Sequence, residues 1–178
     1  YIGSGESYTS GRALGRGIWK SSDKGATWSN IYGGGADGTL NGTQIVNGIF
    51  YVNDLVARNN NGVTELYASI SGANYQDSST PSQFNGLIEQ GLYKSTNNGS
   101  SWSIISFENE NLQTFNPNDI ELDLNNNIWV TTTRTSFGNP GGKIYKSSDG
   151  TTFELVQTIA NTNRTELEVS STDVNKFW

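Results

Sequence analysis

The amino-acid sequence predicts an all-β protein built from a repeated four-stranded unit. A short hairpin sequence occurs three times, at 18–31, 91–105 and 143–156. Other alternating apolar runs lie upstream of these copies, and aromatic residues make up 11% of a chain that also contains 21 glycines. This composition suits short strands joined by tight turns. A sequence that repeats itself in this way is typical of a stacked or radial architecture.

The three hairpins align residue by residue and are expected to supply the last two strands, c and d, of each unit. They read Gly-Ile-Trp-Lys-Ser-Ser-Asp, Gly-Leu-Tyr-Lys-Ser-Thr-Asn and Lys-Ile-Tyr-Lys-Ser-Ser-Asp, each followed by an aromatic residue and a second apolar run. We expect a structural role for the shared residues of these turns, which are Ser21, Asp23, Gly25 and Trp28, then Ser95, Asn97, Gly99 and Trp102, then Ser147, Asp149 and Phe153.

Strands a and b are predicted upstream of the hairpins. Strand b fits 1–5, 66–71 and 128–133, and strand a fits 53–58 and 119–124, with Asn-rich turns between a and b. Residues 165–170 fit strand a of a fourth unit, and 173–178 fit the approach to its strand b.

Four-stranded antiparallel units in tandem predict a β-propeller, with about three blades over residues 1–178. Propellers typically have about four to eight blades, so this propeller is incomplete and we expect the remaining blades from the same or another chain. Because the sequence contains no Met, we also expect a mature or excised segment of a longer protein. A β-solenoid or a sandwich with coincidental hairpins is the alternative.

The Ser-x-Asp-x-Gly-x-Thr-Trp hairpin resembles the Asp-box, or bacterial neuraminidase (BNR) repeat, of sialidases, sortilin-type propellers and xyloglucanase-type glycosidases. The resemblance covers nearly the whole chain and implies a propeller. The second copy carries Asn97 in place of the aspartate, and the third is one residue shorter and ends in Phe153. An Asp or Asn side chain can accept hydrogen bonds from turn N–H groups, and the glycine allows a positive φ. We therefore predict that Asp23 and Asp149 hold turns, and we assign no catalytic residue.

Ligand binding is predicted in the loops between strands b and c, at 6–16, 72–90 and 134–142. These are the longest irregular stretches, and binding groups concentrate on loops that a rigid scaffold carries. The resemblance also places family active sites on this face. Their aromatic and charged side chains suit a sugar or a peptide, and equally suit packing of each loop onto its own blade. The candidates are Glu6, Tyr8, Arg12, Arg16, Tyr75, Asp77, Phe84, Glu89, Arg134 and Phe137.

Composition excludes several kinds of chemistry. The chain has no Cys, His or Met, which removes thiolate nucleophiles, imidazole bases and the usual zinc ligands. A net charge of −6 argues against nucleic acid, and no apolar stretch is long enough to cross a membrane. Residues 123–127 weakly resemble the start of a calcium loop but lack its glycine and distal glutamate, so an Asn-rich turn is favoured. We predict no metal and no cofactor.

The predicted function is that of a non-catalytic propeller segment of a secreted or cell-surface bacterial protein that binds glycan or protein through its b–c loops. The alternative is a xyloglucanase-like or sialidase-like glycoside hydrolase whose catalytic groups lie partly outside this segment. Its candidates are Glu6, Asp77, Glu89, Tyr8 and Arg12, although no sialidase-type Arg-Ile-Pro segment is present.

Residues 1–28 also resemble repeats in large secreted proteins of the Bacteroidetes, many of which use the type IX export route. This resemblance implies an extracellular location. It also implies a third possibility, that the segment is exported cargo or part of a surface assembly.

Overall fold

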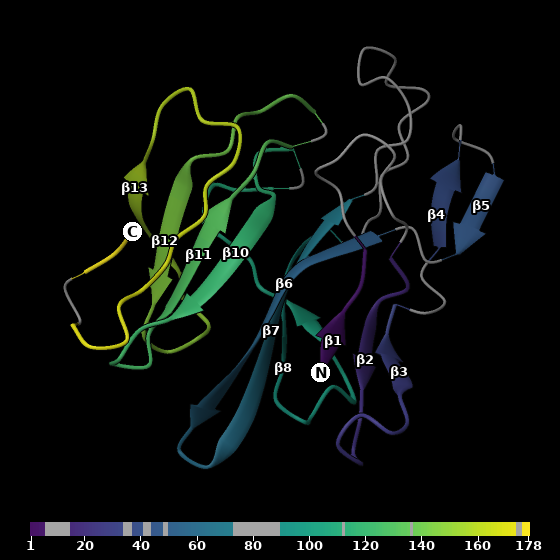
Figure 1. Cartoon of the computed structure of the whole chain (residues 1–178). Helices are drawn as coiled ribbons and strands as arrows, with labels where there is room; N and C mark the ends of the chain where they lie inside the picture. Colours follow the sequence, from purple (N-terminus) through teal and green to yellow (C-terminus); the bar gives the residue numbers. More distant parts are fainter. Residues whose placement is uncertain are drawn as a thin grey trace.

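A computed structural model of the chain describes residues 1–5, 15–33, 37–40, 44–47, 50–72, 90–111, 113–135, 137–173 and 176–178. Every regular element in these ranges is a β-strand. Three antiparallel sheets of three or four strands follow one another along the chain, with one separate two-stranded hairpin (Figure 1). The predicted all-β fold of repeated sheets is confirmed.

The first sheet contains β1 (Ile2–Gly3), β2 (Ile18–Lys20) and β3 (Ser29–Tyr32), paired in that order. These strands correspond to the expected strands b, c and d. The separate hairpin consists of β4 (Asp37–Leu40) and β5 (Gln44–Asn47).

The second sheet contains all four strands, β6 (Phe50–Asn60), β7 (Val63–Gly72), β8 (Gly91–Ser95) and β9 (Ser103–Ile104). Strands β6 and β7 form a long hairpin, closed by a two-residue turn in which Asn61 has φ 52° and Gly62 has φ 87°. Asn-Gly is favoured there because both central residues of such a turn need positive φ.

The third sheet contains β10 (Pro117–Leu122), β11 (Ile128–Thr132), β12 (Lys143–Ser147) and β13 (Glu154–Thr158). Between β10 and β11, the carboxylate of Asp123 accepts hydrogen bonds from the backbone N–H groups of Asn125 and Asn127, both at 2.9 Å. Asn126 has φ 62°, a left-handed conformation that Asn tolerates, so this segment is the predicted Asn-rich turn.

The chain begins a further antiparallel pairing after β13. Glu168 and Trp178 exchange two backbone hydrogen bonds of 3.0 Å, and Val169 pairs with Phe177. The pairing joins the segments expected as strand a and the approach to strand b of a fourth unit.

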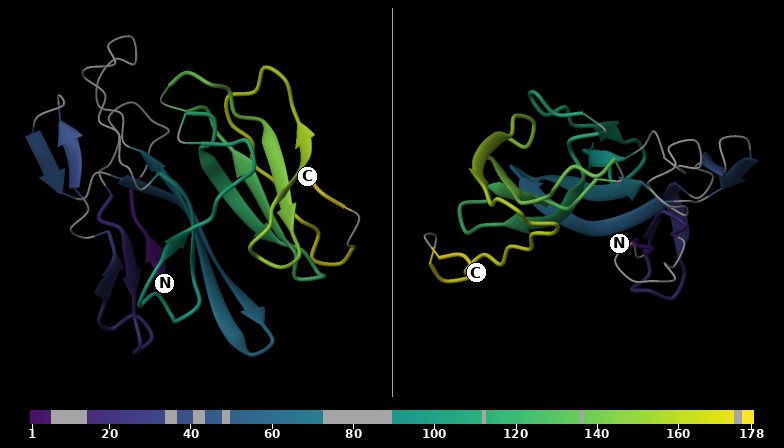
Figure 2. Two further views of the ribbon diagram at one scale, coloured as in Figure 1. Left: turned by 180° about the vertical axis from the view of Figure 1, so that it is seen from behind. Right: turned by 90° about the horizontal axis from the view of Figure 1, so that it is seen from above.

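Apolar side chains are buried between consecutive sheets. Between the first and second sheets, Ile18, Val52, Ala68, Ile70 and Tyr93 form one cluster. A larger cluster joins the second and third sheets, and its members are Tyr67, Leu92, Phe107, Phe115, Ile120, Ile128, Val130, Tyr145 and Phe153. Burying each large apolar side chain stabilises the fold by roughly 1.5–3 kcal/mol. The sheets therefore pack face to face in chain order, as Figure 2 shows from two further directions.

A repeated polar contact joins each four-stranded sheet to the next unit. The Asp54 carboxylate on β6 accepts a hydrogen bond from the backbone N–H of Ile120 at 2.8 Å, and Asp119 on β10 accepts one from the N–H of Leu167 at 2.9 Å. The strand register shifts beside both aspartates, as at a β-bulge. Because a bulge re-aims a side chain, it directs each aspartate to the neighbouring unit. We call these two contacts the sheet-to-sheet joints.

Candidate functional site

The complete first hairpin shows how its turn is built. The Asp23 carboxylate accepts hydrogen bonds from the Thr27 N–H at 2.8 Å and the Thr27 hydroxyl at 2.6 Å. The Ser21 hydroxyl donates to Asp23 at 2.8 Å and accepts from the Gly25 N–H at 2.7 Å. The indole of Trp28 donates to the Gly25 carbonyl at 3.0 Å. The polar groups of Ser21, Asp23 and Trp28 thus bond within their own turn.

The second hairpin reproduces this pattern with an amide in place of the carboxylate. Asn97 accepts from the Ser101 N–H at 2.9 Å and donates its own N–H to the Ser101 hydroxyl at 2.8 Å. Trp102 donates to the carbonyl of Gly99 at 3.1 Å. An Asn can therefore replace the Asp, because the turn needs an acceptor oxygen and no charge.

The shorter third hairpin uses Asp149 as its acceptor. The carboxylate of Asp149 accepts from the N–H groups of Thr151 at 2.7 Å and Thr152 at 2.8 Å. Hydrogen bonds from these two N–H groups hold the pKa of Asp149 well below its usual range, and bonds from the Thr27 side chain and backbone lower the pKa of Asp23 to about 2. A general acid needs a pKa near the working pH, so both shifts run against acid catalysis.

A buried ionic cluster spans three neighbouring strands of the second sheet, β6, β7 and β8. Glu65 on β7 pairs with Arg58 at 3.2 Å and with Lys94 at 2.8 Å, and it accepts hydrogen bonds from Tyr67 at 2.7 Å and Asn60 at 3.2 Å. The side chains of Arg58 and Glu65 are each only 5% exposed. Burial alone would raise the pKa of Glu65, but the bonds from Lys94, Tyr67 and Asn60 outweigh it and hold the pKa below its usual value.

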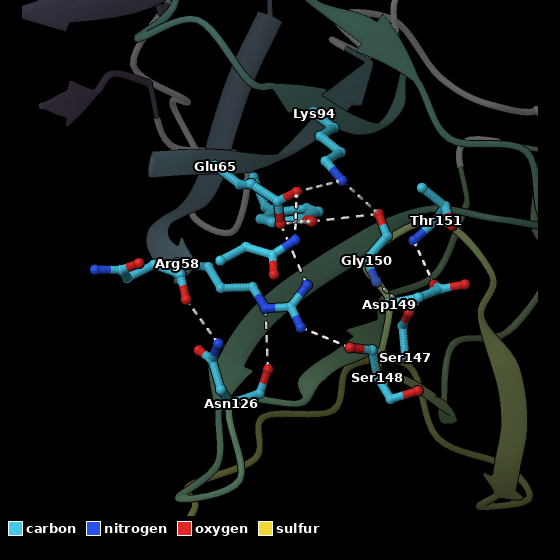
Figure 3. Close-up of polar contacts among 12 residues, drawn as sticks. Arg58, Glu65, Lys94, Asn126, Ser147, Ser148, Asp149, Gly150 and Thr151 are labelled. Atoms are coloured by element: carbon cyan, nitrogen blue, oxygen red, sulfur yellow. Dashed lines mark hydrogen bonds and ion pairs between the residues drawn. The ribbon is translucent and has the colours of Figure 1, made fainter. Parts of the chain in front are cut away.

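This cluster holds the third sheet by its backbone (Figure 3). Arg58 donates to the carbonyls of Asn126 at 3.0 Å and Ser148 at 2.6 Å, and Lys94 donates to the carbonyl of Gly150 at 3.3 Å. Two turns of the third sheet, one between β10 and β11 and one in its hairpin, thus rest on charged side chains of the second. Since each cation already binds protein acceptors, the cluster is a structural contact between sheets.

A repeated cation–π contact accompanies each hairpin. The ammonium nitrogen of Lys20 lies 5.7 Å from the ring centroid of Tyr1, that of Lys94 lies 5.4 Å from Tyr67, and that of Lys146 lies 4.8 Å from Trp129. These lysines, Arg58 and Glu65 are functional contacts that were not predicted from the sequence. The available signal was that a lysine precedes the first turn serine in all three copies.

Two carboxylates on β10 have pKa values closer to neutrality. Burial, together with the charges of Asp54, Glu166 and Glu168, raises the pKa of Asp119 to about 6. Burial and the charges of Asp119, Glu168 and Asp54 raise the pKa of Glu121 to about 7. Such groups can donate a proton near neutral pH, although Asp119 is also bound to the N–H of Leu167. Within the described ranges, no group of three or more acidic residues could hold a metal ion.

The predicted binding loops are described only in part. Arg16, beside the first sheet, and Arg134, beside the third, are exposed, and Phe137 is 45% exposed. Arg16 is held through its backbone, because its N–H donates to the Ser4 hydroxyl at 2.8 Å. The other candidates lie outside the described residues: Glu6, Tyr8, Arg12, Tyr75, Asp77, Phe84 and Glu89.

Comparison with known proteins gives one informative match. No protein-family description and no curated protein matches the chain. Among solved structures, the crystal structure of the Niastella koreensis GH74 enzyme is similar, with a TM-score of 0.54, 22% sequence identity and 89% of this chain covered. This chain spans 21% of the length of that protein. At this identity the likeness shows the fold alone.

The fold of the GH74 enzyme is a β-propeller, so the three sheets described above are propeller blades. Across the described ranges, no helix has the length and apolarity that a bilayer-spanning segment needs.

Proposed function

We propose that this chain is a non-catalytic Asp-box propeller segment that binds glycan or protein through its b–c loops. The observation that carries this proposal is the use of Asp23, Asn97 and Asp149 as acceptors for their own turns. A repeated motif with that role builds a scaffold and leaves recognition to the loops. The propeller fold shared with a GH74 enzyme supports a glycan as the first ligand class to test.

Binding is tested with a glycan array and a pull-down on the full chain. We expect at least one positive signal, and we expect it to weaken in the double variant Arg134→Ala, Phe137→Ala, because both side chains are exposed on the loop at 134–142. Leu124→Ala is the matched control, since Leu124 is 51% exposed in the turn between β10 and β11. Blank results in both assays would contradict the proposal.

A second candidate is a glycoside hydrolase, favoured by the GH74 neighbour and by the raised pKa values of Asp119 and Glu121. Glycosidases of this kind use a pair of carboxyl groups, one of them protonated at the working pH. Hydrolysis of xyloglucan or aryl glycosides by the full chain would support this candidate. If hydrolysis survived removal of the loop carboxylates of Glu6, Asp77 and Glu89, those loops would not hold the catalytic groups.

We further propose a secreted or cell-surface location and a partner that supplies the remaining blades. The resemblance of residues 1–28 to Bacteroidetes surface repeats supports this location and a place as cargo or as part of a surface assembly. Cell fractionation of the producing bacterium, with antibody against this segment, tests it. Signal confined to the cytoplasm would contradict it.

A further inference from the structure

Three side chains recur at matching positions in all three sheets. In each sheet a lysine lies over an aromatic residue of the strand before it, and an aliphatic residue follows on the strand after it. We call each set a trio. The first trio is Tyr1, Lys20 and Ile31, the second is Tyr67, Lys94 and Ile105, and the third is Trp129, Lys146 and Val156.

The turn of the second hairpin covers the first trio. The Tyr1 hydroxyl donates a hydrogen bond to the side chain of Asn98 at 3.5 Å. A side chain at position 99 would collide with Ile31, so only the backbone of Gly99 fits there. Asn98 and Gly99 are the two positive-φ residues of this turn, with φ 58° and 85°. The tip of the second hairpin therefore lies on the first sheet.

The turn of the third hairpin covers the second trio in the same way (Figure 3). The Gly150 carbonyl accepts hydrogen bonds from the Tyr67 hydroxyl at 3.2 Å and from the Lys94 ammonium group at 3.3 Å. Ile105 packs against the apolar cluster that joins the second and third sheets. Two successive units thus make the same kind of contact, in which the turn of one hairpin lies on the trio of the preceding sheet.

The third trio is not covered by any residue that the structure describes. Val156 is 51% exposed, whereas its counterparts Ile31 and Ile105 are half-buried. Within the described part of the chain, the ammonium group of Lys146 has no hydrogen bond or ion pair and lies 4.8 Å from the Trp129 ring centroid. A hollow of about 470 Å³ lies beside it, and its lining includes Asn127, Lys146, Ser147 and Thr152.

The segment after β13 begins a further unit beside the third trio. Glu168 exchanges backbone hydrogen bonds with Trp178, and Glu121 is paired with Trp129 in the same way in the third sheet. Trp178 therefore takes the position in the further unit that Trp129 takes in the third sheet. The ring of Phe177 lies 4.7 Å from that of Trp129, so this unit starts in contact with the trio.

We propose that the third trio binds the turn of a further Asp-box hairpin, supplied by the propeller unit that follows the third sheet. Lys146 donates to the carbonyl of the turn glycine, as Lys94 does, and Val156 is covered as its two counterparts are. This inference rests on the proposal above that a partner supplies the remaining blades, and it does not involve the b–c loops.

The first test is an NMR titration of the ¹⁵N-labelled full chain with a hairpin peptide. The probe is a synthetic copy of residues 143–158, closed by a disulfide between cysteines added at its ends, because Lys143 and Thr158 are paired in the third sheet. We expect it to shift the amide signals of Lys146 and Thr152. A control peptide with Ser147→Ala and Asp149→Ala loses hydrogen bonds of the turn and should bind about fivefold more weakly.

Variants of the full chain locate the contact. Val156→Ser should weaken binding of the peptide about fivefold, because the contact buries an apolar side chain. Lys146→Met keeps an apolar side chain but removes the donor, so binding should fall about tenfold. Leu155→Ser is the matched control and should leave the affinity unchanged. Leu155 is 53% exposed on the same strand, but it lines a different hollow, beside the connection from β9 to β10.

An extended chain tests the contact without the peptide. Residues 2–32 are appended after Trp178, because Trp178 and Tyr1 take the same position in their units, so the extension supplies a complete hairpin. We expect a higher urea midpoint than for the original chain. Val156→Ser should lower the midpoint of the extended chain and leave that of the original chain unchanged, whereas Leu155→Ser should have the same effect in both.

Three results would overturn the proposal. The first is an equal effect of Val156→Ser and Leu155→Ser on binding of the peptide. The second is the absence of peptide-induced shifts together with an extended chain whose midpoint does not respond to Val156→Ser. The third is self-association of the original chain, measured by light scattering, that Val156→Ser abolishes, because a second copy would then be the occupant. Binding of the peptide alongside a blank glycan array and pull-down would contradict the loop function alone.

Discussion

At the scale of single residues, the turn serine bonds to both the backbone of its turn and the Asp or Asn two positions later. Ser21, Ser95 and Ser147 each accept a hydrogen bond from a turn glycine N–H, at 2.7, 2.9 and 2.8 Å. Each also donates to the Asp or Asn two positions later. One hydroxyl therefore fixes both the backbone of the turn and the side chain that completes it.

Replacing the buried serine of the third turn should destabilise the fold. In Ser147→Ala the buried N–H of Gly150 loses its acceptor, which should lower the free energy of unfolding by about 2 kcal/mol. Ser148→Ala is the control, because its side chain is exposed and the carbonyl that binds Arg58 remains, and we expect a change below about 0.5 kcal/mol. Urea unfolding measures both, and equal midpoints for the two variants would refute the role of the hydroxyl.

At the scale of elements, the turn of the third hairpin lies so close to the second sheet that there is no room for a side chain at position 150. Gly150 has φ 75°, and a Cβ placed on it would lie 2.0 Å from the Tyr67 hydroxyl and 2.7 Å from Arg58. Glycine is thus required twice at this position, by the left-handed backbone and by the contact with the neighbouring sheet. The second requirement explains why this turn meets the buried Arg58–Glu65 cluster directly.

Two glycine variants separate these requirements. Gly150→Ala should lower the free energy of unfolding by about 3 kcal/mol, because strain in the turn adds to a clash with Tyr67. Gly62→Ala has the same kind of backbone, φ 87°, but nothing within 4 Å of the added methyl, so only strain of about 1 kcal/mol is expected. Thermal and urea unfolding compare the two variants. If Gly62→Ala lowers the free energy of unfolding as much as Gly150→Ala does, the close approach of Gly150 to Tyr67 does not contribute to the loss.

At the scale of the whole molecule, carboxylates whose pKa values are shifted in opposite directions determine how stability depends on pH. The pKa of Asp119 is raised to about 6 and that of Glu121 to about 7, while hydrogen bonds from Thr27 lower that of Asp23 to about 2. The folded chain therefore keeps protons on Asp119 and Glu121 that the unfolded chain has released. It also releases the proton of Asp23 at a lower pH than the unfolded chain does.

The sign of each effect follows from proton linkage. Between about pH 4 and 7 the folded state binds more protons at Asp119 and Glu121, so their contribution to stability decreases as pH rises. The contribution of Asp23 is present above about pH 4 and is lost as pH falls towards 2. In Asp119→Asn the stability profile should be flatter between pH 4 and 7, and in Asp23→Asn it should change only below pH 4. Urea midpoints measured from pH 2 to 8 test this, and an unchanged slope in Asp119→Asn would contradict it.

The sequence predicts the strands well because their signals are local. Alternating apolar residues and Asn-Gly turns depend only on neighbouring positions, so β6, β7 and the hairpins lie where expected. The contacts between sheets could not be predicted in this way. Arg58 and Glu65 stand in alternating runs where a charged residue indicates a solvent-facing position, yet both are buried. Arg58 bonds to carbonyls at 126 and 148 in another sheet, and Glu65 is the ion-pair partner of Arg58. Glu110 likewise has its partners 33 and 35 residues away.

The sheet-to-sheet joints have a consequence for how units of this kind can be exchanged. Asp54 and Asp119 each accept a hydrogen bond from a main-chain N–H of the following unit, so this hydrogen bond does not itself depend on the side chain at that position. A unit whose strand presents a backbone N–H group at the matching position can form this hydrogen bond, whatever loops the unit carries. Grafting or reordering such units therefore has to preserve the backbone path of the receiving strand and the apolar side chains, such as Ile120, that it buries against the preceding sheet.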